Sequence, residues 1–241
     1  IIVLASSEKS LCNGLPDDIT PLAVVLIKDK LRENVNDTIN YFKEQGVALK
    51  VISGDSVKTV QNIAKDTGIT GAENAIDMTT VKTQEELEKA AENCSVFGRV
   101  TPQQKKQLVI ALKKNGHSVA MTGDGVNDVL ALKEADCSIA MAAGSDAARN
   151  VSQLVLVNND FASMPGVVAE GRRTINNLER SSALYIVKTI YTIILSVFFI
   201  FFHMPYPFEP IHFSLVGALT VGLPSFVLAL QPNKNRIKGN F

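Results

Sequence analysis

Two long apolar segments near the carboxyl end limit what this 241-residue chain can fold into. Residues 181–203 and residues 211–231 are each long enough to cross the hydrocarbon core of a bilayer as a helix. The connection between them, Met-Pro-Tyr-Pro-Phe-Glu-Pro at positions 204–210, contains three prolines and can form only a tight turn. We therefore expect a transmembrane helical hairpin.

Basic residues flank this hairpin at both ends: Arg172, Arg173 and Arg180 before it, and Lys234, Arg236 and Lys238 after it. The positive-inside rule places both ends in the cytoplasm and the proline-rich connection outside. The alternative, a hairpin buried in a soluble core, fits two segments of this length with basic flanks less well. We predict an integral, multi-pass protein of a bacterial-type cell membrane, with residues 1–175 in the cytoplasm and the lipid bilayer as a partner.

Composition excludes other classes of protein. The formal net charge is +0, which argues against a nucleic-acid partner because such partners require a basic face. Cys12, Cys94 and Cys137 form no C-x-x-C pair, so neither a disulfide framework nor a structural zinc site is expected. The chain begins Ile-Ile-Val, and we expect it to be an internal piece of a longer polypeptide.

The first 175 residues alternate between short apolar runs and amphipathic segments, the pattern of an α/β fold with a doubly wound parallel sheet. The run at 23–27 is expected to be a strand covered on both faces. Residues 72–95 are charged and alanine-rich, and we expect a surface helix without chemistry. Further strands are expected at 47–52, 138–141 and 154–157, and further helices from Val35 to a cap at Gly46, at 56–66 before Gly68, and at 102–114 before Gly116.

The segment Met-Thr-Gly-Asp-Gly-Val-Asn-Asp at 121–128 follows the apolar run 118–121. It places two carboxylates and a carboxamide on a glycine-rich turn, where an open α/β sheet binds its ligands. Asp and Asn oxygens are preferred ligands of Mg²⁺, and glycines let the backbone approach a phosphate. A helix N-terminus capped by Asp and Asn is the alternative. Eight consecutive fitting residues favour the metal and phosphate site.

This octet resembles the TGDGxND signature of P-type cation-transporting ATPases, whose phosphorylation domain belongs to the haloacid-dehalogenase-like superfamily. Ser53-Gly54-Asp55 resembles the family's TGD element, with Ser in place of Thr, and residues 99–105 resemble the stretch that carries its catalytic lysine. Residues 29–32 match its hinge motif D-x-x-R, and residues 170–177 resemble its stalk. The resemblance implies an incomplete, Rossmann-type phosphorylation domain at 1–175, followed at 176–241 by the stalk, the fifth and sixth membrane helices and a basic tail.

The resemblance also implies roles for individual residues. The catalytic group would comprise Lys105, Asp124, Asn127 and Asp128, of which Asp124 and Asp128 would ligate Mg²⁺. Phosphate and nucleotide would be held by Ser53, Gly54, Asp55 and Gly125. Lys105 alone would be interpreted as a solvated helix lysine, and only its place after Arg99-Val100-Thr101-Pro102 indicates a fixed charge beside the phosphoryl group.

In the resembled family, ATP phosphorylates an Asp in a DKTGT motif, and the aspartyl phosphate couples hydrolysis to cation transport. Neither DKTGT nor DxDxT occurs in this sequence. We therefore assign the activity to a longer pump polypeptide that supplies nucleotide-binding and actuator domains and further membrane helices, and we expect the fragment alone to be inactive. Two alternatives stay open: a membrane-anchored phosphatase with Asp29 as nucleophile, and a non-catalytic pump subunit.

Polar residues recur at helical spacing in the first apolar segment: Tyr185, Lys188, Thr189, Thr192 and Ser196. A lysine inside a membrane helix usually faces a polar pathway or a carboxylate, although near the interface it can also snorkel to water. In the second segment, Gly217, Gly222 and Pro224 would loosen the backbone or allow close helix packing. We predict a cation pathway lined by Lys188, Thr189, Thr192, Ser196 and Thr220. Hydroxyls are a poor cage for a bare divalent ion, so calcium is only one candidate.

Overall fold

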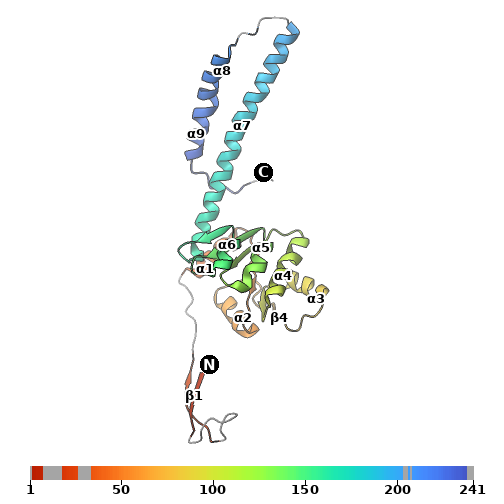
Figure 1. Cartoon of the computed structure of the whole chain (residues 1–241), viewed down its shortest axis with the longest axis vertical. Coiled ribbons are helices and arrows are strands. Elements are labelled where there is room, and N and C mark those ends of the chain that lie inside the picture. Colours follow the sequence, from red (N-terminus) through yellow and green to blue (C-terminus); the bar gives the residue numbers. More distant parts are fainter. Residues whose placement is uncertain (1, 8–17, 27–33, 203–205, 207, 238–241) are drawn as a thin grey trace.

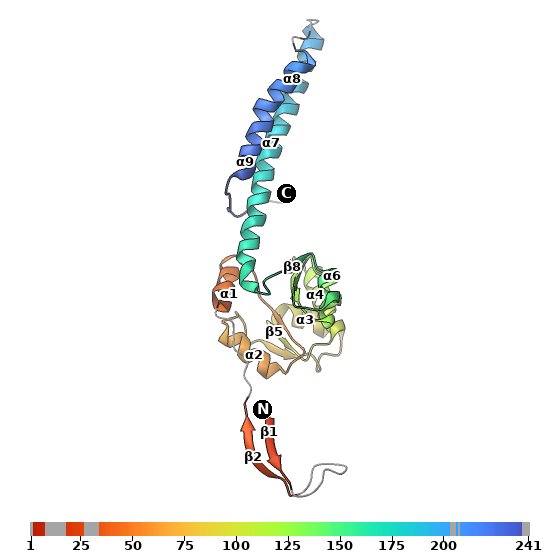
Figure 2. The same ribbon diagram turned by 60° about the vertical axis from the view of Figure 1, so that its left-hand side comes forward.

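The computed structural model describes residues 2–7, 18–26, 34–202, 206 and 208–237. The molecule is elongated: a β-hairpin lies at one end, an α/β unit in the middle and a long helical hairpin at the other end (Figures 1 and 2). This arrangement of parallel strands and helices followed by two long apolar helices confirms the predicted fold class.

The strand predicted at 23–27 forms, but not in the predicted place. β2 (Thr20–Val25) pairs antiparallel with β1 (Ile2–Ser6), and all residues of both strands are exposed. The expectation of a parallel strand covered on both faces is therefore wrong. A continuous apolar run indicates a strand that needs cover, but its pattern does not say which segment supplies that cover. Ile27 lies outside the described residues.

The first parallel sheet has the order β3-β5-β4, from β3 (Val51–Ile52), β4 (Ala75–Asp77) and β5 (Val96–Gly98). The prediction of a single surface helix at 72–95 is wrong, because this region contains β4 and the shorter helix α3 (Gln84–Asn93). Thr83 and Glu86 form a capping box that starts α3 late. The strand predicted at 47–52 is confined to its last two residues.

The second parallel sheet has the order β6-β7-β8, from β6 (Ala120–Gly123), β7 (Cys137–Met141) and β8 (Leu154–Leu156). The strands predicted after residue 117 are thus confirmed within two residues at each end. Among the described residues the strands form two separate three-stranded sheets. The helices of this unit are α1 (Val35–Glu44), α2 (Val57–Asp66), α4 (Pro102–Lys114), α5 (Val129–Glu134) and α6 (Asp146–Val151), with the short 3-10 helices η1 (Val126–Asp128) and η2 (Phe161–Ser163).

Helix α4 joins the two sheets. Leu108 and Ala111 pack into the core under β5, whereas Val109, one residue from Leu108, packs with Met121 of β6. The glycines predicted to end α1, α2 and α4 are confirmed: Gly46, Gly68 and Gly116 have φ of 76°, 76° and 85°. α4 is therefore a rigid element between the two motif-bearing strands.

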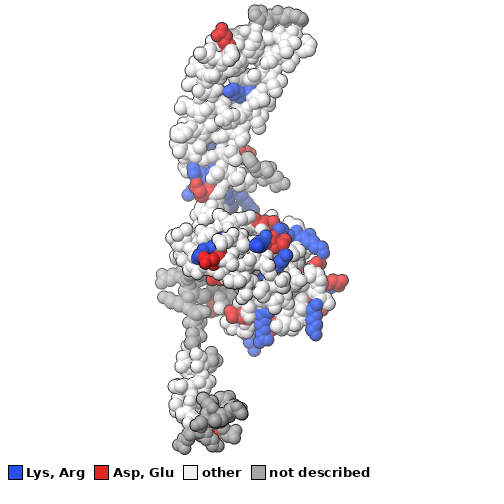
Figure 3. Space-filling view, viewed as in Figure 1, with Lys and Arg blue, Asp and Glu red and all other residues white. Residues whose placement is uncertain are grey.

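The helical hairpin consists of α7 (Met164–Phe202) and a second arm made of α8 (Pro210–Gly217), the π-helix η3 (Ala218–Gly222) and α9 (Leu223–Leu230). Both arms are long and apolar enough to cross a membrane. Of the most apolar 18-residue stretch, 0% is buried in the first arm and 6% in the second. The hairpin surface is almost free of charged side chains, which gather on the α/β unit and at the stalk (Figure 3). The predicted boundary between 175 and 176 lies within α7.

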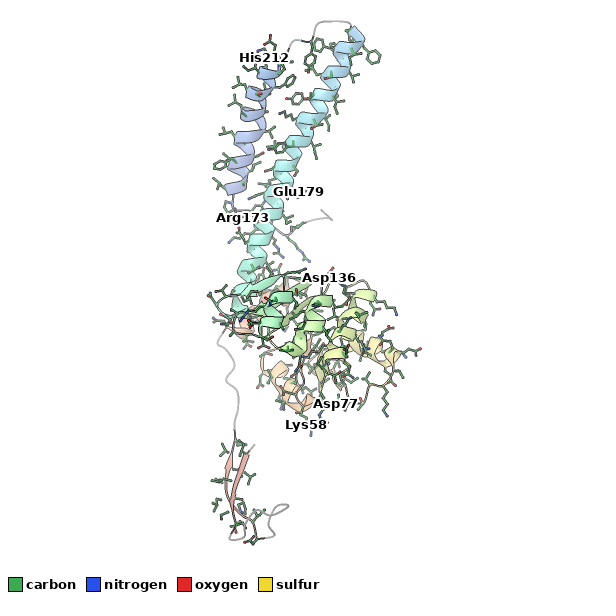
Figure 4. The ribbon with its side chains drawn as sticks, viewed as in Figure 1. Lys58, Asp77, Asp136, Arg173, Glu179 and His212 are labelled. Carbon is green, nitrogen blue, oxygen red and sulfur yellow. The ribbon has the colours of Figure 1, made fainter. Side chains whose placement is uncertain are left out.

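The stalk part of α7 contacts the α/β unit at one end and the second arm of the hairpin at the other. Arg172 donates a hydrogen bond of 2.7 Å to Gln45, the residue after α1. Phe42 of α1 packs on Phe161 of η2, just before α7, with 5.8 Å between the ring centroids. On the other side, the Asn177 amide donates to the carbonyl of Gln231 at 2.9 Å, and Arg180 donates to its side chain at 2.8 Å. Figure 4 shows Arg173 and Glu179 on this stretch of α7, close to the lower end of α9.

Candidate metal and phosphate site

The turn after β6 carries one exposed and one buried carboxylate. Asp124 and Asn127 are exposed, whereas Asp128 is buried. The Gly125 amide donates to Asp128 Oδ2 at 3.2 Å. A Cβ on Gly123 would lie 2.5 Å from Asp128 Cβ, so this position requires glycine. The turn therefore holds one carboxylate inside and leaves the other facing outward.

Lys105 holds the buried carboxylate. Its Nζ lies 2.6 Å from Asp128 Oδ1, and both side chains are 11% exposed. Lys105 lies in the first turn of α4. This helix begins with a capping box formed by Thr101, its N-cap, and Gln104, and Pro102 is its first residue. Lys105 is thus a buried, paired cation. It is not a solvated helix lysine, which is how Lys105 would be interpreted without its surrounding motif.

The second predicted motif forms a tight loop after β3. Ser53 Oγ accepts a hydrogen bond of 3.1 Å from the Asp55 amide, and the Ser53 amide donates to Phe97 O at 3.0 Å. Apart from Gly54 and its two chain neighbours, no atom of the described residues lies within 4 Å of the position of a Cβ on Gly54. The loop is therefore pinned to β5 at its base and open at its tip.

Sequence reasoning assigned no role to Arg99, which supports this loop. Its backbone has φ of 53°, in the left-handed region, and its amide donates to Asp55 O at 2.8 Å. Its guanidinium lies 3.7 Å from Asp77 Oδ2. The Thr79 hydroxyl and amide, with a smaller contribution from Arg99, hold the pKa of Asp77 below its ordinary value. No local signal identifies a non-glycine residue with positive φ.

The two motif loops both follow the carboxyl ends of parallel strands, but on different sheets. Among the described residues no hydrogen bond or ion pair joins Ser53–Asp55 to the turn at Asp124–Asp128, and α4 is the element that contacts both sheets. The structure therefore brings Lys105 and Asp128 together and leaves the other predicted site residues in two groups. Asp29 lies outside the described residues.

Residues 7–136 match the haloacid dehalogenase-like hydrolase family. The chain belongs to this family. The predicted membership of the superfamily is thereby confirmed, and the matched region includes both motif loops and the Lys105–Asp128 pair.

Comparison with individual proteins confirms the resemblance to cation-transporting ATPases. The chain is 43% identical over 253 residues to the calcium-transporting ATPase CtpE of Mycolicibacterium smegmatis, and 41% identical over 252 residues to the probable cation-transporting ATPase exp7 of Streptococcus pneumoniae. Each alignment covers 100% of this chain but 32% of the relative, so the chain spans about a third of the length of these relatives. A solved zinc-transporting PIB-type ATPase shares the fold, with a TM-score of 0.65 at 20% identity over 89% of this chain and 30% of that chain.

Of the predicted pathway residues, Lys188, Thr192 and Ser196 are partly buried in the hairpin, whereas Thr189 and Thr220 are exposed. Lys188 Nζ reaches α8, because a Cβ on Gly217 would lie 2.6 Å from it. The hydroxyls of Thr189, Thr192 and Thr220 donate to carbonyls of their own helices, at 3.0, 2.8 and 2.6 Å. Thr192 and Ser196 also line an open cavity of about 500 Å³ beside the aromatic rings of Phe199, Tyr206 and Phe213.

The second arm has the loosened backbone that its glycines and proline predicted. Between α8 and α9 it becomes the π-helix η3, in which the amide of Leu223 donates to the carbonyl of Ala218. Such segments disturb the regular pairing of carbonyls and are frequent at functional sites. The π-helix begins one residue after Gly217, directly beside the Lys188 ammonium.

Proposed function

We propose that this chain is part of a P-type cation-transporting ATPase: the carboxyl-terminal part of its phosphorylation domain, continuous with its fifth and sixth membrane helices. The observation that carries the proposal is the buried Lys105–Asp128 pair beneath the exposed Asp124, at the carboxyl end of a parallel sheet. The identity of 41–43% to two cation-transporting ATPases across the whole chain supports it.

The donor set of the turn fits Mg²⁺. Asp124 offers a free carboxylate and Asn127 an exposed amide, with Asp128 behind them. Within the described residues no group of three or more His, Cys, Asp or Glu side chains could hold a metal alone. This agrees with Mg²⁺, which takes one or two carboxylates and completes its shell with phosphate oxygens and water. Asp124 and Asp128 are the proposed ligands, and Mg²⁺ bound there would neutralise charge on the transferring phosphoryl group.

The other site residues position and stabilise the phosphoryl group of ATP. Lys105 places a fixed positive charge beside it, and Asp128 keeps that lysine in one geometry. Ser53, Gly54 and Gly125 offer hydroxyl and amide donors to phosphate oxygens, and Asp55 faces the nucleotide end. The nucleophilic Asp is assigned to a segment outside this sequence, together with the nucleotide-binding and actuator domains that complete the reaction cycle.

The transported substrate is proposed to be a cation, and calcium is the first candidate because a relative 43% identical is named a calcium-transporting ATPase. Glu209 is the only acidic residue of the sequence between 181 and 231. Hydroxyls and carbonyls around Lys188, Thr189, Thr192, Ser196 and Thr220 would therefore need ligands from other membrane helices. The hairpin is proposed to cross a bacterial-type cell membrane with residues 1–175 in the cytoplasm.

The test is phosphorylation of the parent polypeptide in native membranes. Membranes are incubated with labelled ATP and Mg²⁺, quenched in acid and probed with an antibody against this segment. A labelled, hydroxylamine-sensitive band much larger than 26.1 kDa is expected, and Asp124→Ala should abolish it. Undiminished labelling of Asp124→Ala would exclude the proposal. An unlabelled band at 26.1 kDa would favour the non-catalytic subunit, and phosphomonoester hydrolysis lost in Asp29→Asn would favour the phosphatase.

A further inference from the structure

Asp124 is an exposed carboxylate at the tip of the turn after β6. Among the described residues, no hydrogen bond or ion pair engages its carboxylate, in contrast to Asp128, which is held by Lys105 and the Gly125 amide. The backbone of Asp124 therefore sets the region that this carboxylate can reach by rotation about its side-chain bonds. Contacts that hold the backbone limit where the carboxylate can bind an ion.

The turn between β7 and α6, residues 142–145, lies directly behind this backbone. The Ser145 amide donates a hydrogen bond of 2.7 Å to the Asp124 carbonyl. A Cβ on Gly144 would lie 2.7 Å from the Asp124 carbonyl oxygen and 3.0 Å from Asp124 Cα. These are backbone atoms that cannot rotate away, so any larger residue at position 144 would displace Asp124 or the turn.

Arg149 of α6 fixes the turn itself. Its guanidinium donates to Ala142 O at 2.5 Å and to Gly144 O at 3.1 Å, and it pairs with Asp146. A guanidinium supplies several donors in one rigid plane and is suited to hold two carbonyls at once. The turn is thus anchored to α6 on one side and pressed against Asp124 on the other.

We propose that residues 142–145, together with Arg149 of α6, form a positioning element for Mg²⁺, in which Gly144, Ser145 and Arg149 set the place of the Asp124 backbone without touching metal or substrate. The inference rests on the proposed function, because it takes Asp124 as a metal ligand. Groups that orient metal ligands typically change metal affinity or activity by about 10- to 100-fold when they are replaced. A shift of this size in Mg²⁺ dependence is therefore expected from a change in the turn alone.

Ser145 allows a matched pair of variants. Its φ of −64° suits proline, and Ser145→Pro removes the N–H that donates to Asp124 and puts a ring carbon in its place. Both Ser145→Pro and Ser145→Ala lose the hydroxyl that caps α6 at the Ala148 amide, but Ser145→Ala keeps the N–H. Gly144→Ala is paired with Gly166→Ala, whose added Cβ would meet no atom of the described residues within 4 Å beyond the adjoining backbone of its own helix.

Two readouts are measured in the parent polypeptide: the Mg²⁺ concentration for half-maximal phosphorylation by ATP, and the binding of Mn²⁺ without ATP, followed by the electron paramagnetic resonance signal of the free ion. Ser145→Pro, Gly144→Ala and Arg149→Lys should weaken both by about 10-fold or more, and both controls should stay within about twofold of wild type. Thermal unfolding identifies the variants that fold.

Wild-type Mg²⁺ and Mn²⁺ dependence in folded Gly144→Ala and Ser145→Pro would overturn the inference. So would failure of all three variants to fold while both controls fold, because the turn would then be a structural element only. Asp124→Ala distinguishes failure of the proposed function from failure of the positioning role. If it is still phosphorylated, the proposed function fails; if it is not, and the turn variants behave as wild type, only the positioning role fails.

Discussion

Lys105 Nζ and Asp128 Oδ1 lie 2.6 Å apart, and each side chain is 11% exposed. This pair connects α4, which packs against both parallel sheets, to the turn that carries the predicted metal ligands. A charge pair removed from water gains little net stability, but loss of one partner leaves the other charge buried and uncompensated. The pair is therefore costly to break and suited to keep a cation in one geometry.

Breaking this pair should destabilise the α/β unit. Lys105→Met or Asp128→Leu alone should lower the free energy of unfolding by about 3 kcal/mol, and the double variant should cost clearly less than the sum. Denaturant unfolding monitored by circular dichroism measures the effect. Lys114→Met breaks the exposed pair with Glu88 and should cost less than about 1 kcal/mol. Additive single effects would show that the two groups are not coupled.

Asn177 should hold the end of the second membrane arm against the stalk. It is 5% exposed, and its amide donates to Gln231 O at 2.9 Å and Ala229 O at 3.3 Å. Asn177→Leu keeps the volume but removes the donor to the Gln231 carbonyl, at a cost of about 1–3 kcal/mol, whereas the Ala229 carbonyl still accepts from Arg173 at 2.9 Å. Spin labels at Glu179 and Lys234 should show a broader distance distribution in this variant.

The control for that measurement is Thr174→Val. The Thr174 hydroxyl donates only to Glu170 O of its own helix, at 3.0 Å, so its loss should leave the distance distribution unchanged. Equal broadening in both variants would mean that α7 itself has been disturbed and that Asn177 is not the clamp.

Gly217 should determine where the Lys188 ammonium lies. A Cβ at Gly217 would meet Nζ at 2.6 Å, and the flexible lysine chain can move away. Gly217→Ala should therefore change the rate at which an amine reagent labels Lys188 several-fold, yet change stability by about 0.5 kcal/mol or less. Gly222→Ala is the matched control, because its Cβ would meet only Gly217 O at 3.7 Å. Unchanged labelling of Lys188 in Gly217→Ala would contradict the placement.

Asp136 should give the α/β unit an acid-sensitive contribution to stability. The Val119 amide at 2.9 Å and Lys113 at 3.2 Å hold the pKa of Asp136 below its ordinary value (Figure 4). With a lowered folded-state pKa, the contribution is complete above the unfolded pKa of about 4 and is lost as the pH falls through the folded pKa. Asp136→Asn should lower the melting temperature at pH 7 by more than it does near pH 3. A difference independent of pH would contradict this.

Some elements of the fold are predictable from the sequence and others are not. The octet at 121–128 and the glycines that end α1, α2 and α4 were predictable because their signals are local: turn chemistry, helix period and positive φ. β5 (Val96–Gly98) was missed, although all its residues are buried and it pairs with β3 and β4. Three residues are too few to show a period, and a central strand owes its state to its neighbours.

The sequence by itself determined the family resemblance, the alternation of strands and helices and the two apolar arms, and it singled out Lys105, Asp124 and Asp128 as candidate site residues, because these depend on residue types and short spacings. Only the tertiary structure decided that Asp128 rather than Asp124 pairs with Lys105, that β2 lies apart from the parallel sheets, and that Gly144 and Ser145 stand behind Asp124. Each of these is a contact between segments distant in the chain. Such contacts are selected by packing and by the pairing of buried polar groups across the whole fold, and no local pattern records them.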